Sequence, residues 1–171
     1  KYWLLWRRVT VAVRGVAGTR FGNDPRLFYL GGPYTFRGAW YADMSGHSIM
    51  FTNAEIRFPF IDFLAMGWPL PIVLRGIGGV LFFDMASAWL DNEAFQPFTG
   101  TNAKWFKLKD AQAAWGFGIR TNLGYMVLRF DMSHTLDHYD TNFYQTPQGL
   151  YKTEELVKGR RRNFFSIGYD Y

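Results

Sequence analysis

The sequence has no cysteine and only three histidines. Without thiols it can form neither a disulfide framework nor a thiolate metal site, and it offers no thiol nucleophile. No stretch approaches the roughly 18 uninterrupted apolar residues that a membrane-spanning helix requires. The longest apolar candidate, residues 68–90, contains prolines, glycines, Arg75 and Asp84. A helical membrane protein is therefore not expected, although this segment could form one long strand.

The start of the chain also lacks familiar signals. It reads KYWLLWRRV, without an initiator methionine, a basic leader or a small-residue cleavage site. We therefore expect residues 1–171 to be a fragment that starts inside a larger protein, whose N-terminal part is missing. Nineteen basic residues against 14 acidic ones give a net charge of +5, which by itself is compatible with nucleic acid, anionic lipid or neither as a partner.

Apolar and polar residues alternate with a period of two along much of the chain, which predicts β-strands. Residues 125–134 show the pattern: Met126, Leu128 and Phe130 alternate with Arg129 and Asp131. The same alternation occurs in residues 7–18, 47–60, 113–121 and 163–171. With the long apolar segment, this predicts about six full strands, and residues 1–5 read as the tail of another.

The predicted connections alternate between long and short. They fall at residues 20–46, 60–71, 91–110, 122–124 and 138–162. A soluble antiparallel sheet also alternates apolar and polar faces, but long loops on one side and tight turns on the other are typical of outer-membrane barrels. Strands of roughly 9 to 14 residues exceed the usual globular length of about 5 or 6. We therefore predict an all-β fold, the C-terminal part of an antiparallel transmembrane β-barrel with long extracellular loops and short periplasmic turns.

Aromatic residues near the predicted strand ends agree with this fold, because Trp and Tyr side chains settle at headgroup depth. The aromatic residues concerned are Trp3, Trp6, Trp68, Trp89, Tyr125, Tyr139, Tyr169 and Tyr171. Single-chain membrane barrels start at eight strands, and an open edge in lipid leaves backbone groups unpaired. More strands are therefore expected upstream or on a partner.

Four stretches carry a resemblance to a known family: LFYLGGPYTFRGAWY (27–41), NAEIRFPF (53–60), GVLFFDMASAW (79–89) and NFFSIGYDY (163–171). They resemble the C-terminal half of the bacterial surface antigen superfamily of outer-membrane barrels, which includes the BamA and TamA assembly factors and the two-partner secretion transporters. The most specific elements are Gly31-Gly32 followed by Phe36-Arg37-Gly38, the run Glu55-Ile56-Arg57-Phe58-Pro59, and Phe82-Phe83-Asp84.

The resemblance implies that a loop containing Gly32, Phe36, Arg37 and Gly38 folds into the barrel. It also implies that Arg37 meets Glu55, Phe82 and Asp84 on the following strands. The alternation of residues agrees, because Glu55 shares a face with Asn53 and Arg57, and Asp84 shares one with Phe82 and the small residues Gly76, Gly78 and Ala86. A buried guanidinium needs partners. For an isolated Phe-Arg-Gly tripeptide, a solvated loop arginine is the alternative.

Two further signals lie near the end of the chain. Alternate apolar residues ending in an aromatic resemble the C-terminal signal by which outer-membrane barrels are recognised for insertion, and here they are Phe165, Ile167, Tyr169 and Tyr171. The alternative is an ordinary lipid-facing strand. A basic cluster just before it, Lys158, Arg160, Arg161 and Arg162, is placed to contact lipid-A phosphates at the extracellular rim. A merely solvated charge run is the alternative there.

Other chemistry is not expected. His134 and His138 lie four residues apart near Asp137 and Asp140, but a strand running into a loop does not present them as a helix would. We expect no metal, no cofactor, no enzymatic activity and no nucleic-acid partner, because no base and nucleophile have convincing spacing and no basic face is interleaved with aromatics.

The resemblance implies a role in inserting proteins into, or moving them across, the bacterial outer membrane, by a barrel whose first and last strands can part. The expected partners are outer-membrane lipid, lipopolysaccharide, and protein clients or partner subunits. A passive anchor for an upstream soluble domain or a partner complex is the alternative. A small-solute pore would need an open interior, which the arginine loop would fill.

Overall fold

The computed structural model describes residues 1–6, 8–23, 26–69, 72–90, 98–99, 107–123, 126–146 and 149–168. Within these residues all regular structure is β-strand, and no segment is helical. Accordingly, the described part of the chain has no helix with the length and apolar character needed to cross a membrane. The predicted all-β class is confirmed.

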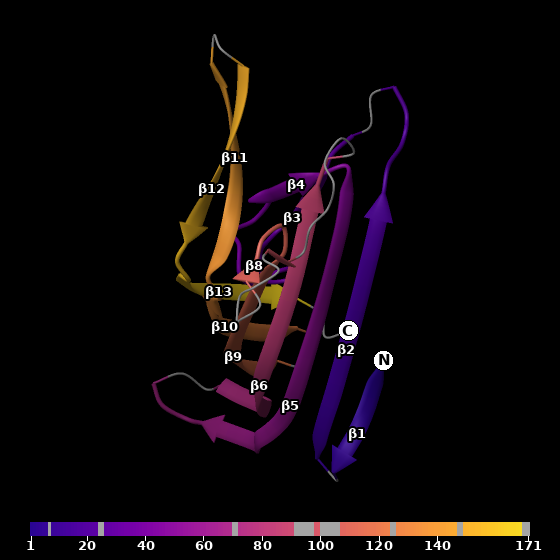
Figure 1. Ribbon diagram of the computed structural model, residues 1–171. Coiled ribbons are helices and arrows are strands. Elements are labelled where there is room, and N and C mark those ends of the chain that lie inside the picture. Colours follow the sequence, from indigo (N-terminus) through magenta and orange to yellow (C-terminus); the bar gives the residue numbers. More distant parts are fainter. Residues whose placement is uncertain are drawn as a thin grey trace.

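A curved seven-stranded antiparallel sheet forms the body of the molecule (Figure 1). Its strands, in spatial order, are β1 (Tyr2–Trp6), β2 (Val9–Thr19), β5 (Ser48–Met66), β6 (Ile72–Trp89), β9 (Gln112–Asn122), β10 (Val127–Thr135) and β13 (Arg161–Gly168). Each strand pairs with the one before it in this order. Among the described strands, β1 and β13 are the two edges.

Two smaller sheets are built from the long connections. One is the hairpin of β3 (Phe28–Leu30) and β4 (Met44–Gly46). The other contains β7 (Phe98–Thr99), β8 (Lys107–Leu108), β11 (His138–Thr146) and β12 (Gly149–Val157). The predicted loop at 138–162 is therefore wrong in part, because most of it forms the β11–β12 hairpin, which projects beyond the main sheet in Figure 1.

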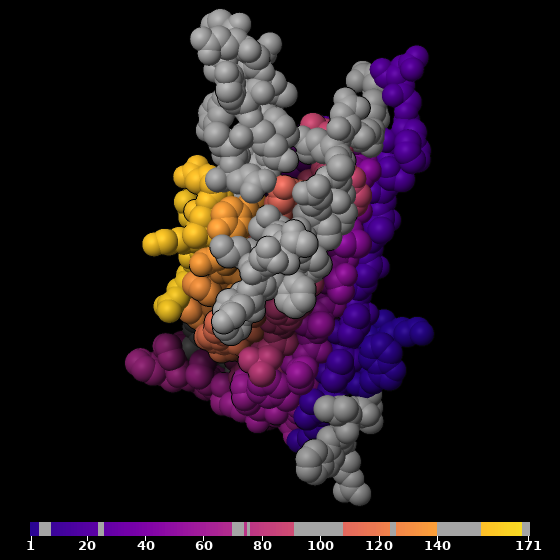
Figure 2. Space-filling view, in the orientation of Figure 1, coloured from indigo at the N-terminus to yellow at the C-terminus, as the bar shows by residue number. Residues whose placement is uncertain are grey.

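The predicted connection at residues 60–71 is also too long. Strand β5 continues to Met66 and β6 begins at Ile72. The alternation predicts a strand over residues 47–60 only. In the structure the register shifts between Pro59 and Ile61, and a bulge of this kind admits proline and then lets pairing resume. The resulting β5–β6 hairpin protrudes at the lower left in Figure 2.

The connections fall at two ends of the main sheet. We call the end at which β1 joins β2, β5 joins β6 and β9 joins β10 the short-turn end. The end at which β2 joins β5, β6 joins β9 and β10 joins β13 is the long-loop end. Because antiparallel neighbours reverse direction at each connection, the alternation of short and long connections along the chain places them at opposite ends.

The two faces of the main sheet differ in chemistry. On the outer face, large apolar side chains are solvent-exposed; they include Ile56, Leu81, Phe83, Trp115, Phe117, Ile119, Phe130, Phe165 and Ile167. On the opposite, inner face, buried polar and charged side chains alternate with them, among them Asn53, Glu55, Asp84, Arg129 and Asp131. An apolar outside and a polar inside invert the arrangement of an ordinary soluble sheet.

A small apolar core fixes the β3–β4 hairpin and its loop to the inner face near the long-loop end. Leu30, Phe36 and Ala39 from the hairpin pack with inner-face residues such as Phe51 and Ala86. Phe36 is fully buried. This core brings the segment between β3 and β4 against β5, β6 and β9.

Candidate functional site

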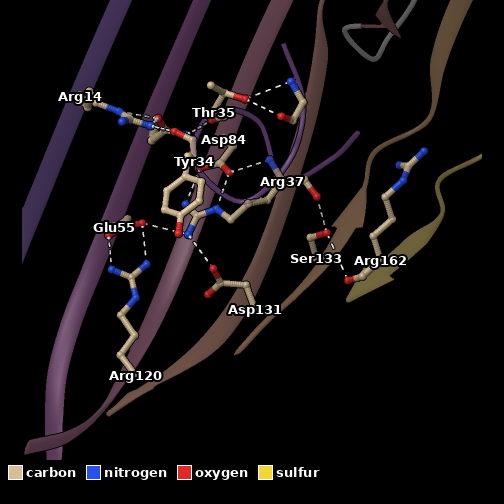
Figure 3. Close-up of polar contacts among 12 residues, drawn as sticks. Arg14, Tyr34, Thr35, Arg37, Glu55, Asp84, Arg120, Asp131, Ser133 and Arg162 are labelled. Carbon is tan, nitrogen blue, oxygen red and sulfur yellow. Dashed lines mark hydrogen bonds and ion pairs between the residues drawn. The ribbon is translucent and has the colours of Figure 1, made fainter. Parts of the chain in front are cut away.

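The segment that joins β3 to β4, residues 31–43, is here called the Arg37 loop. It folds back over the inner face of the sheet (Figure 3). Its start is closed by Thr35, whose Oγ donates to the Gly31 carbonyl at 2.9 Å and accepts from the Gly31 amide at 3.0 Å. Gly31 has φ = +125°, and a Cβ there would lie 1.9 Å from the Trp40 carbonyl oxygen. Only glycine fits this reversal.

Close packing also explains Gly38. A Cβ at this position would lie 2.3 Å from the Phe36 ring and 2.9 Å from Thr135. Because the Phe36 ring folds back under its own loop, the residue after Arg37 needs to be the smallest one. Gly32 also has positive φ, at +93°. The glycines and Phe36 together allow the loop to turn tightly enough to aim Arg37 at the sheet.

The side chain of Arg37 is buried and forms a bidentate salt bridge with Asp84 on β6. Its Nε lies 2.7 Å from Asp84 Oδ2 and its Nη2 lies 2.7 Å from Oδ1. The Arg37 backbone amide also donates to Asp84 Oδ2 at 3.3 Å. The guanidinium carbon lies 3.5 Å from the centre of the Phe82 ring, a cation–π contact. Asp84 is fully buried, so its carboxylate is bound by the Arg37 guanidinium and not by water.

Two more carboxylates face the same guanidinium. Arg37 Nη1 lies 2.9 Å from Glu55 Oε1 on β5 and 3.8 Å from Asp131 Oδ2 on β10. Burial alone lowers the pKa of Arg37, but the hydrogen bonds and charge of Asp84, with the charges of Glu55 and Asp131, raise it above its ordinary value. Arg37 is therefore a permanently charged centre held by three strands.

The backbone of the loop is held as well. Ser133 on β10 donates to the Arg37 carbonyl at 2.5 Å, and the Tyr34 hydroxyl donates to the Ile167 carbonyl on β13 at 2.9 Å. Asn53 on β5 donates to the Thr35 carbonyl at 2.7 Å. The bonds from Ser133 and Asn53 satisfy loop carbonyls, as buried backbone groups require, and the bond from Tyr34 ties the loop to the backbone of β13.

The structure thus brings Gly32, Phe36, Arg37 and Gly38 of the loop together with Glu55, Phe82 and Asp84 on the sheet. Asp131, Ser133 and Tyr34 were not singled out from the sequence. A signal was present for two of them, because the alternation in residues 125–134 places Asp131 and Ser133 opposite the apolar Leu128 and Phe130. That these contacts anchor the loop functionally stays a prediction.

The side chains of the basic cluster near the end of the chain do not all point the same way. Arg162 follows the strand alternation onto the inner face, where its Nη1 donates to the Gly38 carbonyl and its Nη2 lies 3.9 Å from Asp43. It is therefore a loop contact, not a group turned to lipid. Lys158, Arg160 and Arg161 are exposed, and lipid-A contact remains a prediction for them.

The proposed insertion signal lies partly within the described residues. Phe165 and Ile167 are 66% and 52% exposed on the outer face, where an apolar side chain meets lipid if the sheet spans a membrane. Tyr169 and Tyr171 lie outside the described residues. No group of three or more potential metal ligands occurs in the part of the chain that the structure describes.

Comparison with known proteins gives the family. A model of the Omp85 superfamily domain matches residues 4–150, a span that contains the Arg37 loop and all three of its carboxylate partners. Searches of curated proteins and of solved structures return no match. The family match agrees with the resemblance carried by the Gly31-Gly32, Phe36-Arg37-Gly38 and Phe82-Phe83-Asp84 motifs. The chain belongs to the Omp85 superfamily, a family of outer-membrane proteins associated with protein insertion and translocation.

Proposed function

We propose that this chain forms part of a transmembrane β-barrel in the bacterial outer membrane and takes part there in the insertion or translocation of proteins. The observation that carries the proposal is the buried Arg37 network. It fixes a loop across the polar face of a sheet whose other face is apolar. A soluble protein gains nothing from exposing that apolar face.

The free edges of the sheet support a larger barrel. Among the described strands β1 and β13 each have one neighbour. In hydrocarbon each unpaired backbone group costs several kcal/mol, so both edges need further strands. A barrel that closes between its first and last strands can open there, and such an opening gives a client polypeptide a path into the bilayer.

The Arg37 loop favours protein handling over a passive solute pore. It occupies the inner face that a pore would leave open to solvent. In this proposal Gly32, Phe36, Arg37 and Gly38 form the anchor, with Glu55, Phe82 and Asp84 as its partners. Phe165, Ile167, Tyr169 and Tyr171 serve as the insertion signal, and Lys158, Arg160 and Arg161 meet lipopolysaccharide phosphates.

The barrel itself is tested by heat-modifiable gel migration of the full-length protein, extracted from outer membranes in mild detergent. We expect the unboiled, folded form to migrate differently from the boiled form. A chain recovered in the soluble fraction, with the same migration before and after boiling, would contradict the barrel.

The role is tested by depleting the protein in its source bacterium and quantifying the outer-membrane and surface proteins. We expect one or more of them to be lost, and to return with the wild-type gene but not with a variant lacking residues 33–41. The matched control is a variant with a deletion in the exposed segment 21–23. If depletion leaves those proteins unchanged and instead releases a soluble partner from the membrane fraction, the protein is a passive anchor.

A further inference from the structure

A cavity of about 310 Å³ lies on the inner face, between the Arg37 loop and the short-turn end of the sheet. Lys1 and residues from β1, β2, β5, β9 and β10 form its walls, and Pro33 and Tyr34 of the loop cover one side. Its lining is strongly basic. The arginines are Arg14, Arg37, Arg57, Arg120 and Arg129, and the carboxylate among the lining residues is Glu55.

The single carboxylate is already shared. Glu55 Oε1 lies 2.9 Å from Arg37 Nη1 and 3.0 Å from Arg120 Nη2. Its other oxygen accepts from Arg57 Nε at 2.9 Å. Asp84 and Asp131 also face Arg37, so three carboxylates meet the guanidinium groups of Arg37, Arg57 and Arg120. The positive excess of the lining therefore comes from outside this group.

Arg14 adds charge that is held by neutral acceptors. Its Nε and Nη2 donate to Asn53 Oδ1 at 3.0 and 2.7 Å, and Nη2 also donates to the Tyr34 carbonyl at 2.5 Å. A guanidinium has five N–H donors, so these bonds fix its position and leave the Nη1 donors for another acceptor. Arg129 lies on the opposite wall, 5.7 Å from the centre of the Tyr34 ring.

We propose that this cavity is a binding site for an oxyanion, the group shared by phosphate and by carboxylate side chains. Several pre-positioned guanidinium groups on low-dielectric walls focus a positive potential, and their planar forks match the paired oxygens of phosphate and carboxylate. The ligand is either a free small anion or an Asp or Glu side chain of a polypeptide. The inference does not depend on a role in protein insertion or translocation.

The test uses the full-length protein, folded in an uncharged detergent and a buffer free of phosphate and sulfate. Isothermal titration calorimetry measures the binding of inorganic phosphate and, separately, of a hexaglutamate peptide, with hexaglutamine as the neutral control. We expect saturable binding of at least one anionic probe. Phosphate binding alone identifies a small-anion site, and hexaglutamate binding alone identifies a site for acidic polypeptide; either supports the proposal.

Two variants locate the site. We expect Arg14→Gln to weaken binding by about tenfold or more, the loss of one charge-assisted hydrogen-bonding group. Arg14→Lys, which keeps the charge but not the fork, should give a smaller loss. Arg8→Gln is the matched control. Arg8 lies just before β2, the strand that contains Arg14, but it forms a solvent-exposed ion pair with Asp62. Unchanged migration of the unboiled form checks that each variant is folded.

The proposal is overturned if wild-type protein binds neither phosphate nor hexaglutamate saturably. It is also overturned if hexaglutamine binds as well as hexaglutamate, or if Arg8→Gln weakens binding as much as Arg14→Gln does. Each of these results would mean that the arginines serve only to hold Glu55 and the loop backbone.

Discussion

Arg37 draws its contacts from side chains on three strands. Asp84 holds it from β6, Glu55 from β5 and Asp131 from β10 (Figure 3). A charge buried this deeply is stable only while its partners are present. The network therefore makes the position of the loop dependent on the correct pairing of these strands.

At this scale we predict that Asp84→Asn lowers the free energy of unfolding by about 3 to 5 kcal/mol, because it leaves the Arg37 guanidinium buried with one charge fewer. The measurement is urea unfolding of the full-length protein in detergent, followed by the loss of the unboiled gel form. Asp62→Asn is the control. It removes a partner from the exposed Arg8–Asp62 pair, in which each side chain is 69% exposed, and should cost at most about 1 kcal/mol.

Charge reversal tests the contact itself. Arg37→Glu should destabilise the barrel, and Asp84→Arg in the same chain should restore part of the lost stability. If neither Asp84→Arg nor Glu55→Arg restores any of it, the contacts at 2.7 and 2.9 Å do not hold the loop in the folded protein.

Some of these residues follow from the sequence and others do not. Glu55, Phe82 and Asp84 were identified because they stand in motifs and share a face with small or polar residues. Asp131 and Ser133 carried the same alternation but no motif, and β10 reaches the loop only through the curvature of the sheet. Tyr34 and Arg162 bond to backbone carbonyls far along the chain, and the period of a strand holds no information about such contacts.

At the scale of the element, β13 is the strand whose placement depends most on other parts of the molecule. It pairs with β10, with Phe165 opposite Phe130. Its inner face touches the Arg37 loop through Arg162, and the Trp40 and Phe164 rings meet edge to face with centroids 5.4 Å apart. An edge strand of eight residues is thus held by a ladder on one side and a loop beneath it.

Cysteine cross-linking tests this register, because the chain contains no cysteine of its own. We predict that Phe130→Cys with Phe165→Cys forms a disulfide in the folded full-length protein, since these residues are directly opposite each other. Phe130→Cys with Asn163→Cys, displaced by two residues, is the control and should cross-link poorly. Equal yields, read on a non-reducing gel, would mean that the strand slips in register.

Most of the long strands were predicted from alternation, because each has one apolar and one polar face over many residues, whereas the segment that forms β6 was predicted from its apolar run. What failed was the extent of β5 and the hairpin in residues 138–162. The predicted strand stops at residue 60, whereas in the structure the register shifts between Pro59 and Ile61 and pairing then continues. The strands β11 and β12 belong to a separate, smaller sheet, and their sequence lacks the regular apolar–polar alternation that identified the other strands.

At the scale of the whole molecule, the contrast between the faces determines which solvent each one meets. Phe117 and Leu81 on the outer face are 47% and 50% exposed, whereas Arg14 lines a cavity on the inner face. In a membrane, the first pair should meet acyl chains and Arg14 should meet water.

Thiol labelling in liposomes checks this placement. We predict that Phe117→Cys in the full-length protein resists a charged, water-soluble maleimide but reacts with a lipid-soluble one, while Arg14→Cys reacts with both. Denatured protein is the control, and both cysteines should then react with both reagents. Equal reaction of the two folded variants with the charged reagent would show that the outer face is not in lipid.

The contacts of the Arg37 loop join residues that are far apart in the sequence, and this affects when during folding the loop is fixed in place. Its contacts with Asp84, Ser133 and Ile167 join residues 47, 96 and 133 positions apart. During synthesis the loop is made before these partners, so its full set of contacts cannot form until β13 is present. Contacts of such separation form late because the intervening chain must first be ordered. The loop is therefore fully held only after β6, β10 and β13 have taken their places in the sheet.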